Sequence, residues 1–146
     1  MATLSKQRSL ELLKEQGALY WDVERPWNPY TKKRLDLFNL FDIISINIGV
    51  PGITGYQCCG SDSSDHVKKV LEGFVDGSGK KIEPNKFMAP WLRAGNTALI
   101  WSWRKRCYEK QDGHRSKAKE WVLFQIEFVL KDSQVVAQEI PHDNEP

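Results

Sequence analysis

The sequence has no long hydrophobic run. No apolar segment in its 146 residues approaches the roughly 20 residues that a membrane-spanning helix needs. The N-terminal stretch MATLSKQRSLELL also lacks the apolar core of a secretory signal peptide. We therefore expect no membrane partner and an intracellular location.

Cysteine is scarce as well. The chain has three cysteines, of which Cys58 and Cys59 are adjacent, so a disulfide framework is excluded. Neighbouring residues of a strand point to opposite faces, and we expect these two to be reduced thiols. No second cysteine or histidine pair completes the four ligands of a structural zinc site.

The net charge of +2 is too small to indicate a nucleic-acid partner by itself. The charged residues are unevenly distributed along the chain. Residues 103–119 contain seven Lys or Arg and two acids, whereas residues 132–146 contain four acids and no Lys or Arg. This pattern indicates either a polyanion-binding side and a solvated acidic tail, or a charged loop and a frayed terminus.

The composition, 40% hydrophobic and 27% charged, is typical of one globular domain. Hydrophobic periodicity predicts helices over 3–16, 65–74 and 84–94, and strands over 18–24, 42–48, 53–59, 97–103 and 121–130. Residues 26–34 and 76–81 are expected to be loops. The order predicts an α/β (α+β) domain over 1–131, with a mixed central sheet flanked by helices, followed by an acidic tail over 132–146.

The stretch 42–59 is typical of a β-hairpin, with β-branched residues on either side of Gly-Val-Pro-Gly. If Ile48 lies opposite Ile53, antiparallel pairing places Asp42 opposite Cys59. Since side chains alternate along a strand, Asp42, Gln57 and Cys59 then share one face. A one-residue shift in register would separate them. These three residues are the candidate site.

The same stretch resembles a known superfamily. Arg34-Leu35-Asp36-Leu37-Phe38, Phe41-Asp42-Ile43-Ile44 and Gly55-Tyr56-Gln57-Cys58-Cys59 together resemble the PD-(D/E)XK nucleases, above all their small Holliday-junction-resolvase-like and phage-borne members. Their pattern is Asp on one strand and (D/E)-x-K on the next. Asp42 matches the first acid, Gln57 stands at the second, and Cys59 stands where the lysine belongs.

The resemblance implies a restriction-endonuclease-like core and metal-dependent DNA cleavage. Mg²⁺ or Mn²⁺ would be bound by Asp42, by the amide oxygen of Gln57 and by a strand carbonyl near Cys58. A first-helix acid often completes such a site, which indicates Glu11, with Glu15 as the alternative. The missing lysine would be replaced from the helix over 65–74, by Lys69 or else Lys68. Dimers are common in this superfamily, so a homodimer is compatible with it.

Several cations are candidate DNA contacts. The loop over 26–34 mixes Trp27 and Tyr30 with basic residues that suit phosphates and bases, or its aromatic residues cap the core while the cations are solvated. The complete set of candidate DNA-binding residues is Lys32, Lys33, Arg34, His66, Lys68, Arg104, Lys105 and Arg106.

Three other functions remain open. Cys59 and His66 could form a thiolate–imidazole pair, although no cysteine-protease signature surrounds them. A nuclease fold that no longer cuts could bind DNA or a protein partner. The aromatic-rich surface, with six tryptophans, could instead mediate assembly.

Overall fold

Six strands form one mixed sheet in the order β1-β4-β5-β8-β9-β10. The computed structural model describes residues 4–30, 33–109 and 115–141, without the side chains of 27, 33–35, 107–109 and 115–119. The strands are β1 (Leu19–Asp22), β4 (Ile43–Ile46), β5 (Thr54–Cys59), β8 (Thr97–Glu109), β9 (Arg115–Lys131) and β10 (Gln134–Ile140). β5 and β8 run parallel, and the other neighbouring strands of this sheet run antiparallel.

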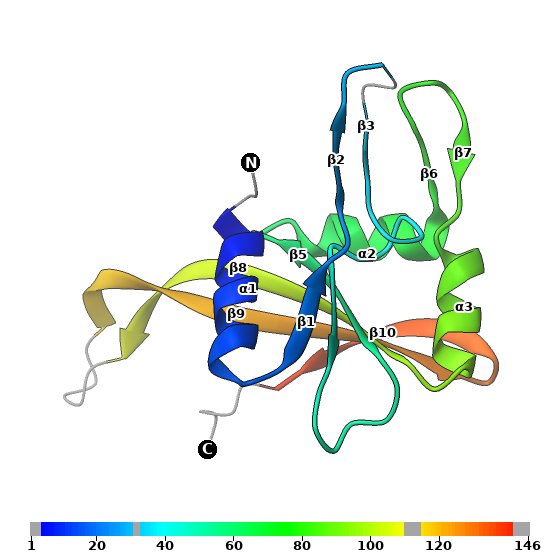
Figure 1. Ribbon diagram of the computed structural model, residues 1–146. Helices are drawn as coiled ribbons and strands as arrows, with labels where there is room; N and C mark the ends of the chain where they lie inside the picture. Colours follow the sequence, from blue (N-terminus) through cyan, green and yellow to red (C-terminus); the bar gives the residue numbers. More distant parts are fainter. Residues whose placement is uncertain (1–3, 31–32, 110–114, 142–146) are drawn as a thin grey trace.

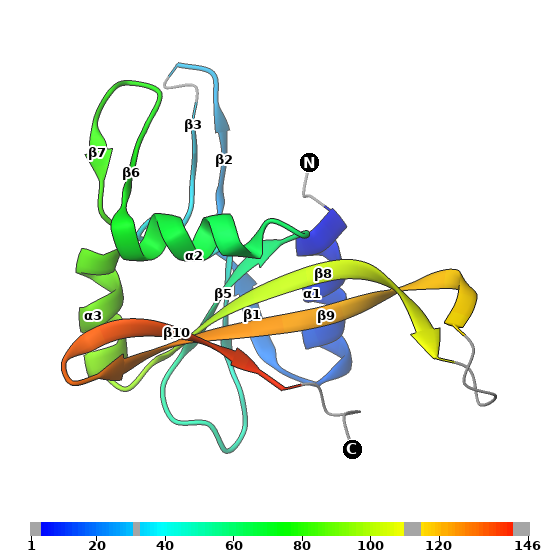
Figure 2. The same cartoon turned by 180° about the vertical axis from the view of Figure 1, so that it is seen from behind.

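Helices cover both faces of the sheet (Figures 1 and 2). α1 (Leu4–Glu15) packs on one face, and α2 (Ser63–Glu72) and α3 (Asn85–Arg93) pack on the other. The predicted class, a single α/β (α+β) domain with a mixed sheet flanked by helices, is confirmed. No helix in the described part of the chain is long and apolar enough to cross a membrane.

The alternation of side chains along β5 divides the core in two. Tyr56 and Cys58 pack with Leu13 on the α1 side, whereas Cys59 packs with Val70 and Met88 on the α2 and α3 side. Both cysteines of β5 are free and buried, and they lie on opposite faces of the strand as predicted.

Two short hairpins project side by side from the same end of the molecule (Figures 1 and 2). The first pairs β2 (Arg25–Asn28) with β3 (Lys33–Leu35), and the second pairs β6 (Phe74–Val75) with β7 (Lys81–Ile82). We call them arm 1 and arm 2. The prediction of a loop over 26–34 was wrong. In a two-stranded ribbon each strand has one open edge, and a proline such as Pro26 is tolerated there because its missing N–H is not needed for pairing.

The C-terminal part of the chain also differs from the prediction. β8 and β9 form a much longer hairpin than the predicted strands over 97–103 and 121–130. The whole length of β10 pairs with β9. Residues 134–140 therefore belong to the sheet and not to an acidic tail. Asp132 and Ser133 have positive φ values of 52° and 65°, the backbone that a tight two-residue hairpin turn requires. Residues 142–146 of the predicted tail lie outside the described residues.

Candidate metal centre

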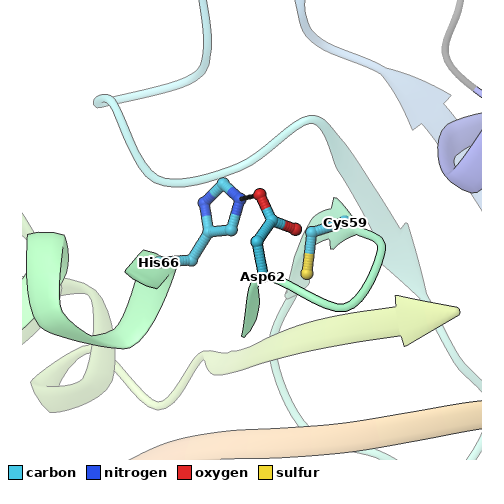
Figure 3. Close-up of side chains that lie close together, drawn as sticks. All are labelled: Cys59, Asp62 and His66. Carbon is cyan, nitrogen blue, oxygen red and sulfur yellow. Dashed lines mark ion pairs between the residues drawn. The ribbon is translucent and has the colours of Figure 1, made fainter. Parts of the chain in front are cut away.

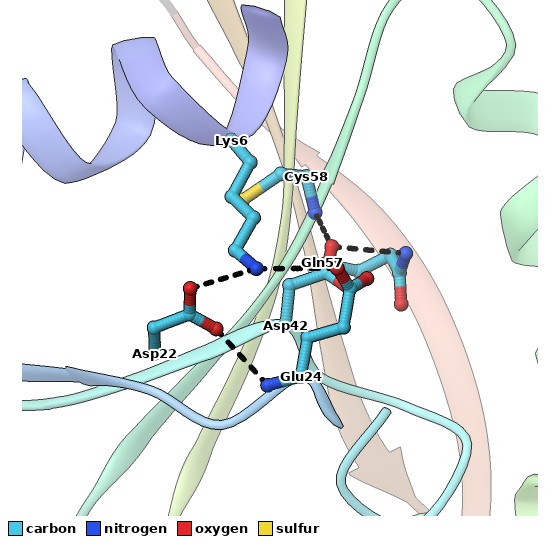
Figure 4. Close-up of polar contacts among 6 residues, drawn as sticks. All are labelled: Lys6, Asp22, Glu24, Asp42, Gln57 and Cys58. Carbon is cyan, nitrogen blue, oxygen red and sulfur yellow. Dashed lines mark hydrogen bonds and ion pairs between the residues drawn. The ribbon is translucent and has the colours of Figure 1, made fainter. Parts of the chain in front are cut away.

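Asp42 and Gln57 meet at the start of β4. The register pairs Ile44 with Gly55 and Ser45 with Thr54, two residues away from the predicted pairing. A two-residue shift leaves every side chain on its predicted face. Gln57 Nε2 therefore donates to Asp42 Oδ2 at 3.3 Å, as Figure 4 shows. The same oxygen accepts a 2.9 Å bond from the backbone N–H of Cys58, so Cys58 contributes a donor here, where a ligand carbonyl was expected.

Two further carboxylates approach Asp42. Glu24 follows β1, and its backbone N–H and that of Val23 both donate to the Asp42 carbonyl, at 3.3 Å and 3.0 Å. Asp36 precedes a small closed loop, whose ends are joined by the antiparallel bridge between Leu37 and Phe41. A carboxylate oxygen from each of Glu24, Asp36 and Asp42 lies within 4.8 Å of the others. We call these three residues the acid cluster.

Lys6 of α1 lies against the acid cluster. Its side chain is 7% exposed, and its Nζ pairs with Asp22 at 2.8 Å and with Glu24 at 3.2 Å (Figure 4). Burial opposes protonation of Lys6, but the bonds from its ammonium to Asp22 and Glu24 outweigh burial and raise its pKa. The first helix therefore supplies a cation at this site.

Burial, together with the crowding of like charges, perturbs the pKa values of the carboxyl groups. Burial, reinforced by the charge of Asp36, raises the pKa of Asp42 to about 9, against the lowering effect of the Cys58 N–H. Burial raises the pKa of Asp36 to about 6, although its hydrogen bond with Asp42 lowers it. Burial also acts to raise the pKa of Glu24, but hydrogen bonds with Lys6 and Asp42 hold it below its usual value. Without a bound metal ion, the acid cluster therefore retains one proton at neutral pH, on Asp42.

A cavity of about 130 Å³ opens beside the acid cluster. Asp36 and Gln57 line it from the sheet side, and His66 and Lys69 line it from α2. The remaining wall is mostly apolar and includes Phe41 and other core side chains. Lys69 is exposed, and its Nζ lies 5.5 Å from the centroid of the Phe74 ring. The structure thus brings Lys69 to the same cavity as Gln57.

Other predicted site residues lie elsewhere. Glu11 is exposed on α1, whose buried residues are Lys6, Ser9 and Leu13. The spacing of 100° per residue turns Glu11 away from Lys6, so the acid cluster is completed by strand-end acids and not by the first helix.

The predicted DNA contacts are divided among several elements. Arg104 is held within the fold, since it donates to Ser63 Oγ at 2.6 Å and to Ser102 Oγ at 3.1 Å. Lys68, Lys105 and Arg106 are exposed. Lys32 and the side chains of Lys33 and Arg34 lie outside the described residues.

Cys59 lies at a second group of ligand-type side chains (Figure 3). Its Sγ, a carboxylate oxygen of Asp62 and a ring nitrogen of His66 lie within 4.8 Å of one another. Burial and the charge of Asp62 raise the pKa of the Cys59 thiol to about 12. The His66 Nε2 faces Asp62 Oδ2 at 3.4 Å. A neutral thiol of this kind does not serve as a nucleophile, which argues against the thiolate–imidazole pair.

Sequence reasoning missed Lys6, Glu24 and Asp36 as site residues. Asp36 lies within the stretch that carries the family resemblance, but nothing local predicts the loop that returns the chain to Asp42. Lys6 gave a usable signal, because it shares a helical face with Leu10 and Leu13, and a lysine on an apolar face is unusual. Glu24 gave none beyond its position at the end of a predicted strand.

Comparison with known proteins found no match to this chain among protein-family models, curated proteins or solved structures.

Proposed function

We propose that this protein is a divalent-metal-dependent endonuclease that hydrolyses phosphodiester bonds in DNA. The observation that carries the proposal is the meeting of Glu24, Asp36 and Asp42, whose donor atoms lie within 4.8 Å, beside the Lys6 ammonium. Asp42 also matches the first acid of the PD-(D/E)XK pattern, and Gln57, which stands at the position of the second acid, is hydrogen-bonded to it.

The donor set fits a hard cation. All three charged donors are carboxylate oxygens, and the amide oxygen of Gln57 can add a neutral ligand, which is the coordination that Mg²⁺ and Mn²⁺ prefer. The raised pKa values of Asp36 and Asp42 support the same assignment, because a dication relieves the repulsion among buried carboxylates. The acid cluster thus has more carboxylates than the sequence pattern alone provides.

Each residue then has a role that follows from its position. A bound dication would polarise the scissile phosphate and lower the pKa of the attacking water. Lys6 supplies positive charge on the α1 side, where it stabilises charge that develops on the phosphate oxygens. It takes over the function of the lysine that Cys59 replaces. Lys69 and His66 line the cavity on the α2 side, which supports a role for them in phosphate binding.

The two arms support a long polyanion as the substrate. Arm 1 ends at Leu35, directly before Asp36, and arm 2 begins at Phe74, which lines the cavity. Both arms therefore start at the walls of the site and project side by side (Figure 1). Their exposed residues include Arg25, Tyr30, Lys80 and Lys81. Cations and an aromatic ring on such arms suit phosphate and base contacts along a duplex.

A nicking assay tests the proposal. Supercoiled, linear and branched DNA are incubated with the protein and Mg²⁺ or Mn²⁺, with EDTA as the blank. Asp42→Asn should abolish cleavage, whereas Glu11→Gln, an exposed carboxylate on the far side of α1, should leave cleavage unchanged. Folding of each variant is checked by circular dichroism. Intact DNA of all three kinds with both metals, in a folded wild-type protein, refutes the nuclease assignment.

One observation favours the alternative, a nuclease fold that binds a partner without cutting. Leu19, Trp21 and Ile46 are 71%, 72% and 54% exposed. Leu19 pairs with Ile46 across β1 and β4, so these side chains form one apolar patch at the edge of the sheet. Light scattering decides between a homodimer through this patch and a monomer, and Trp21→Arg should dissociate such a dimer.

A further inference from the structure

A second group of donors lies where β5 turns into α2, outside the acid cluster. Cys59 is the last residue of β5, Asp62 precedes α2, and His66 lies in the first turn of that helix (Figure 3). Cys59 is 5% exposed, whereas the Asp62 side chain is 58% exposed. The group therefore has a buried sulfur at its base and an opening to solvent.

The spacing of the donors suits a tetrahedral ion. Two ligands of one zinc ion, at 2.0–2.3 Å from the metal, lie about 3.3–3.8 Å apart. Asp62 Oδ2 and His66 Nε2 are 3.4 Å apart, and all three donors lie within 4.8 Å. The three donors therefore lie close to the spacing of three corners of a tetrahedron around one ion. The exposed side leaves the fourth corner to water.

The turn that carries these donors is held by bonds to β8. Ser102 Oγ donates to the Gly60 carbonyl at 2.5 Å, and Arg104 Nη2 donates to Ser63 Oγ at 2.6 Å. The Asp62 carbonyl accepts a bond from the His66 N–H at 3.4 Å, so the two residues lie one helical turn apart at the start of α2. The bonds from Ser102 and Arg104 tie the turn that carries Cys59, Asp62 and His66 to the neighbouring strand.

We propose that Cys59, Asp62 and His66 bind a divalent transition-metal ion of the zinc type. A thiolate, an imidazole and a carboxylate form a donor set that Zn²⁺ and Co²⁺ accept, whereas Mg²⁺ does not favour sulfur. On binding, the Cys59 thiol releases one proton to solvent and its sulfur becomes an anionic ligand.

Binding here would affect the nuclease site next to it. His66 also lines the cavity beside Gln57, so an ion on His66 would fix one wall of that cavity. The ion would also join the end of β5 to the start of α2. We expect Zn²⁺ to raise the thermal midpoint of the metal-free protein, since it binds only the folded arrangement of the three donors. This site rests on its own donors and does not depend on DNA cleavage.

Titration of EDTA-treated protein with Co²⁺ tests the proposal. We expect one equivalent to give a thiolate-to-cobalt charge-transfer band in the near ultraviolet, and Zn²⁺ to remove it. Cys59→Ser and His66→Gln should abolish the band. Cys58→Ser is the matched control on the opposite face of β5, and Cys107→Ser excludes the third cysteine. Both should retain the band.

Asp42→Asn distinguishes the two metal centres. This variant removes a ligand of the acid cluster but should keep the cobalt band. A loss of nuclease activity therefore does not count against a metal site at Cys59, Asp62 and His66. If Cys59→Ser fails to fold, Asp62→Asn and His66→Gln, at less buried positions, decide the matter. Folded wild-type protein without a charge-transfer band, or a band that survives in His66→Gln and Asp62→Asn, overturns the proposal.

Discussion

Asp36 and Asp42 are brought together by a bridge in which neither takes part. The backbones of Leu37 and Phe41 exchange two hydrogen bonds, of 2.9 Å and 3.2 Å, and so close the five-residue loop between the two acids. Phe38 and Asn39 reverse the chain with positive φ values of 56° and 60°. Two carboxyl groups are thus held beside each other by backbone geometry, despite their mutual repulsion.

The Phe41 side chain ties this loop to the sheet, which gives a prediction for Gly55. A Cβ at Gly55 would lie 2.6 Å from the Phe41 ring, so Gly55→Ala must displace the ring and the loop. We expect the variant to lose about 1–3 kcal/mol of unfolding free energy, as overpacked cores do. It should also bind Mn²⁺ more weakly. Gly77→Ala is the control, because nothing lies within 4 Å of its added methyl. Equal urea midpoints for the two variants would contradict this role of Gly55.

Lys6 gives the second prediction. Replacing it by Met leaves Asp22 and Glu24 without their cation, and charged hydrogen bonds of this kind contribute about 1.5–3 kcal/mol each. We expect Lys6→Met to be destabilised by an amount in this range and to nick DNA about 100-fold more slowly at saturating Mn²⁺.

The control for Lys6 is Lys14→Met, an exposed lysine of the same helix. Urea denaturation and single-turnover nicking measure the two effects separately. Lys6→Arg retains the charge and should recover most of the stability. A Lys6→Met enzyme that cleaves at the wild-type rate would exclude Lys6 from the reaction and leave it a structural ion pair.

Periodicity was enough to predict the helices, the mixed sheet and the face that Asp42 shares with Gln57. The register was wrong by two residues because the connection runs from Asn47 to Ile53 and is held by contacts that a local turn pattern does not contain. Asn47 Nδ2 donates to Tyr56 Oη at 3.2 Å, and the Ile53 N–H donates to Asn96 Oδ1, 43 residues away, at 3.0 Å. These bonds set the length of the loop.

The acid cluster could not be predicted for a similar reason. Glu24 and Asp36 lie outside regular strands, and their positions depend on backbone bonds to Asp42 and across the Leu37–Phe41 bridge. Neither set of bonds leaves a periodic pattern in the sequence. Lys6 was not predicted as a site residue, because an acid of this helix was expected to complete the site. The buried side of the helix instead includes Lys6 and Ser9.

The two thiols of β5 give the third prediction. Burial raises the pKa of Cys58, and burial with the Asp62 charge raises that of Cys59 to about 12, so both are protonated at pH 8. Only the thiolate is alkylated rapidly. We expect neither residue to react with iodoacetamide in folded, metal-free protein, and both to react in urea, as peptide mapping by mass spectrometry will show. Rapid alkylation of Cys59 alone in the folded state would instead support a cysteine nucleophile.

The last prediction concerns pH. Asp42 has a folded-state pKa of about 9 and Asp36 one of about 6, both above the usual value of 3.8. A raised folded-state pKa means that the folded protein binds the proton more tightly than the unfolded chain does. The stabilisation that these two protons give the folded state is therefore complete below pH 4 and declines as the pH rises. The decline ends at about pH 6 for Asp36 and at about pH 9 for Asp42. Its slope is up to about 1.4 kcal/mol per pH unit for each proton.

In EDTA, the thermal midpoint of the wild type should accordingly decrease as the pH is raised from 5 to 9, and more steeply than that of Asp42→Asn. This variant keeps an acceptor for the Cys58 N–H but has no proton to lose. Mn²⁺ should reverse this trend, because it competes with protons for the same carboxylates. Its stabilising effect should thus be larger at pH 8.5 than at pH 5.5, and it should be much reduced in Asp42→Asn. A manganese effect that is independent of pH, or equal in both proteins, would place the ion away from Asp42.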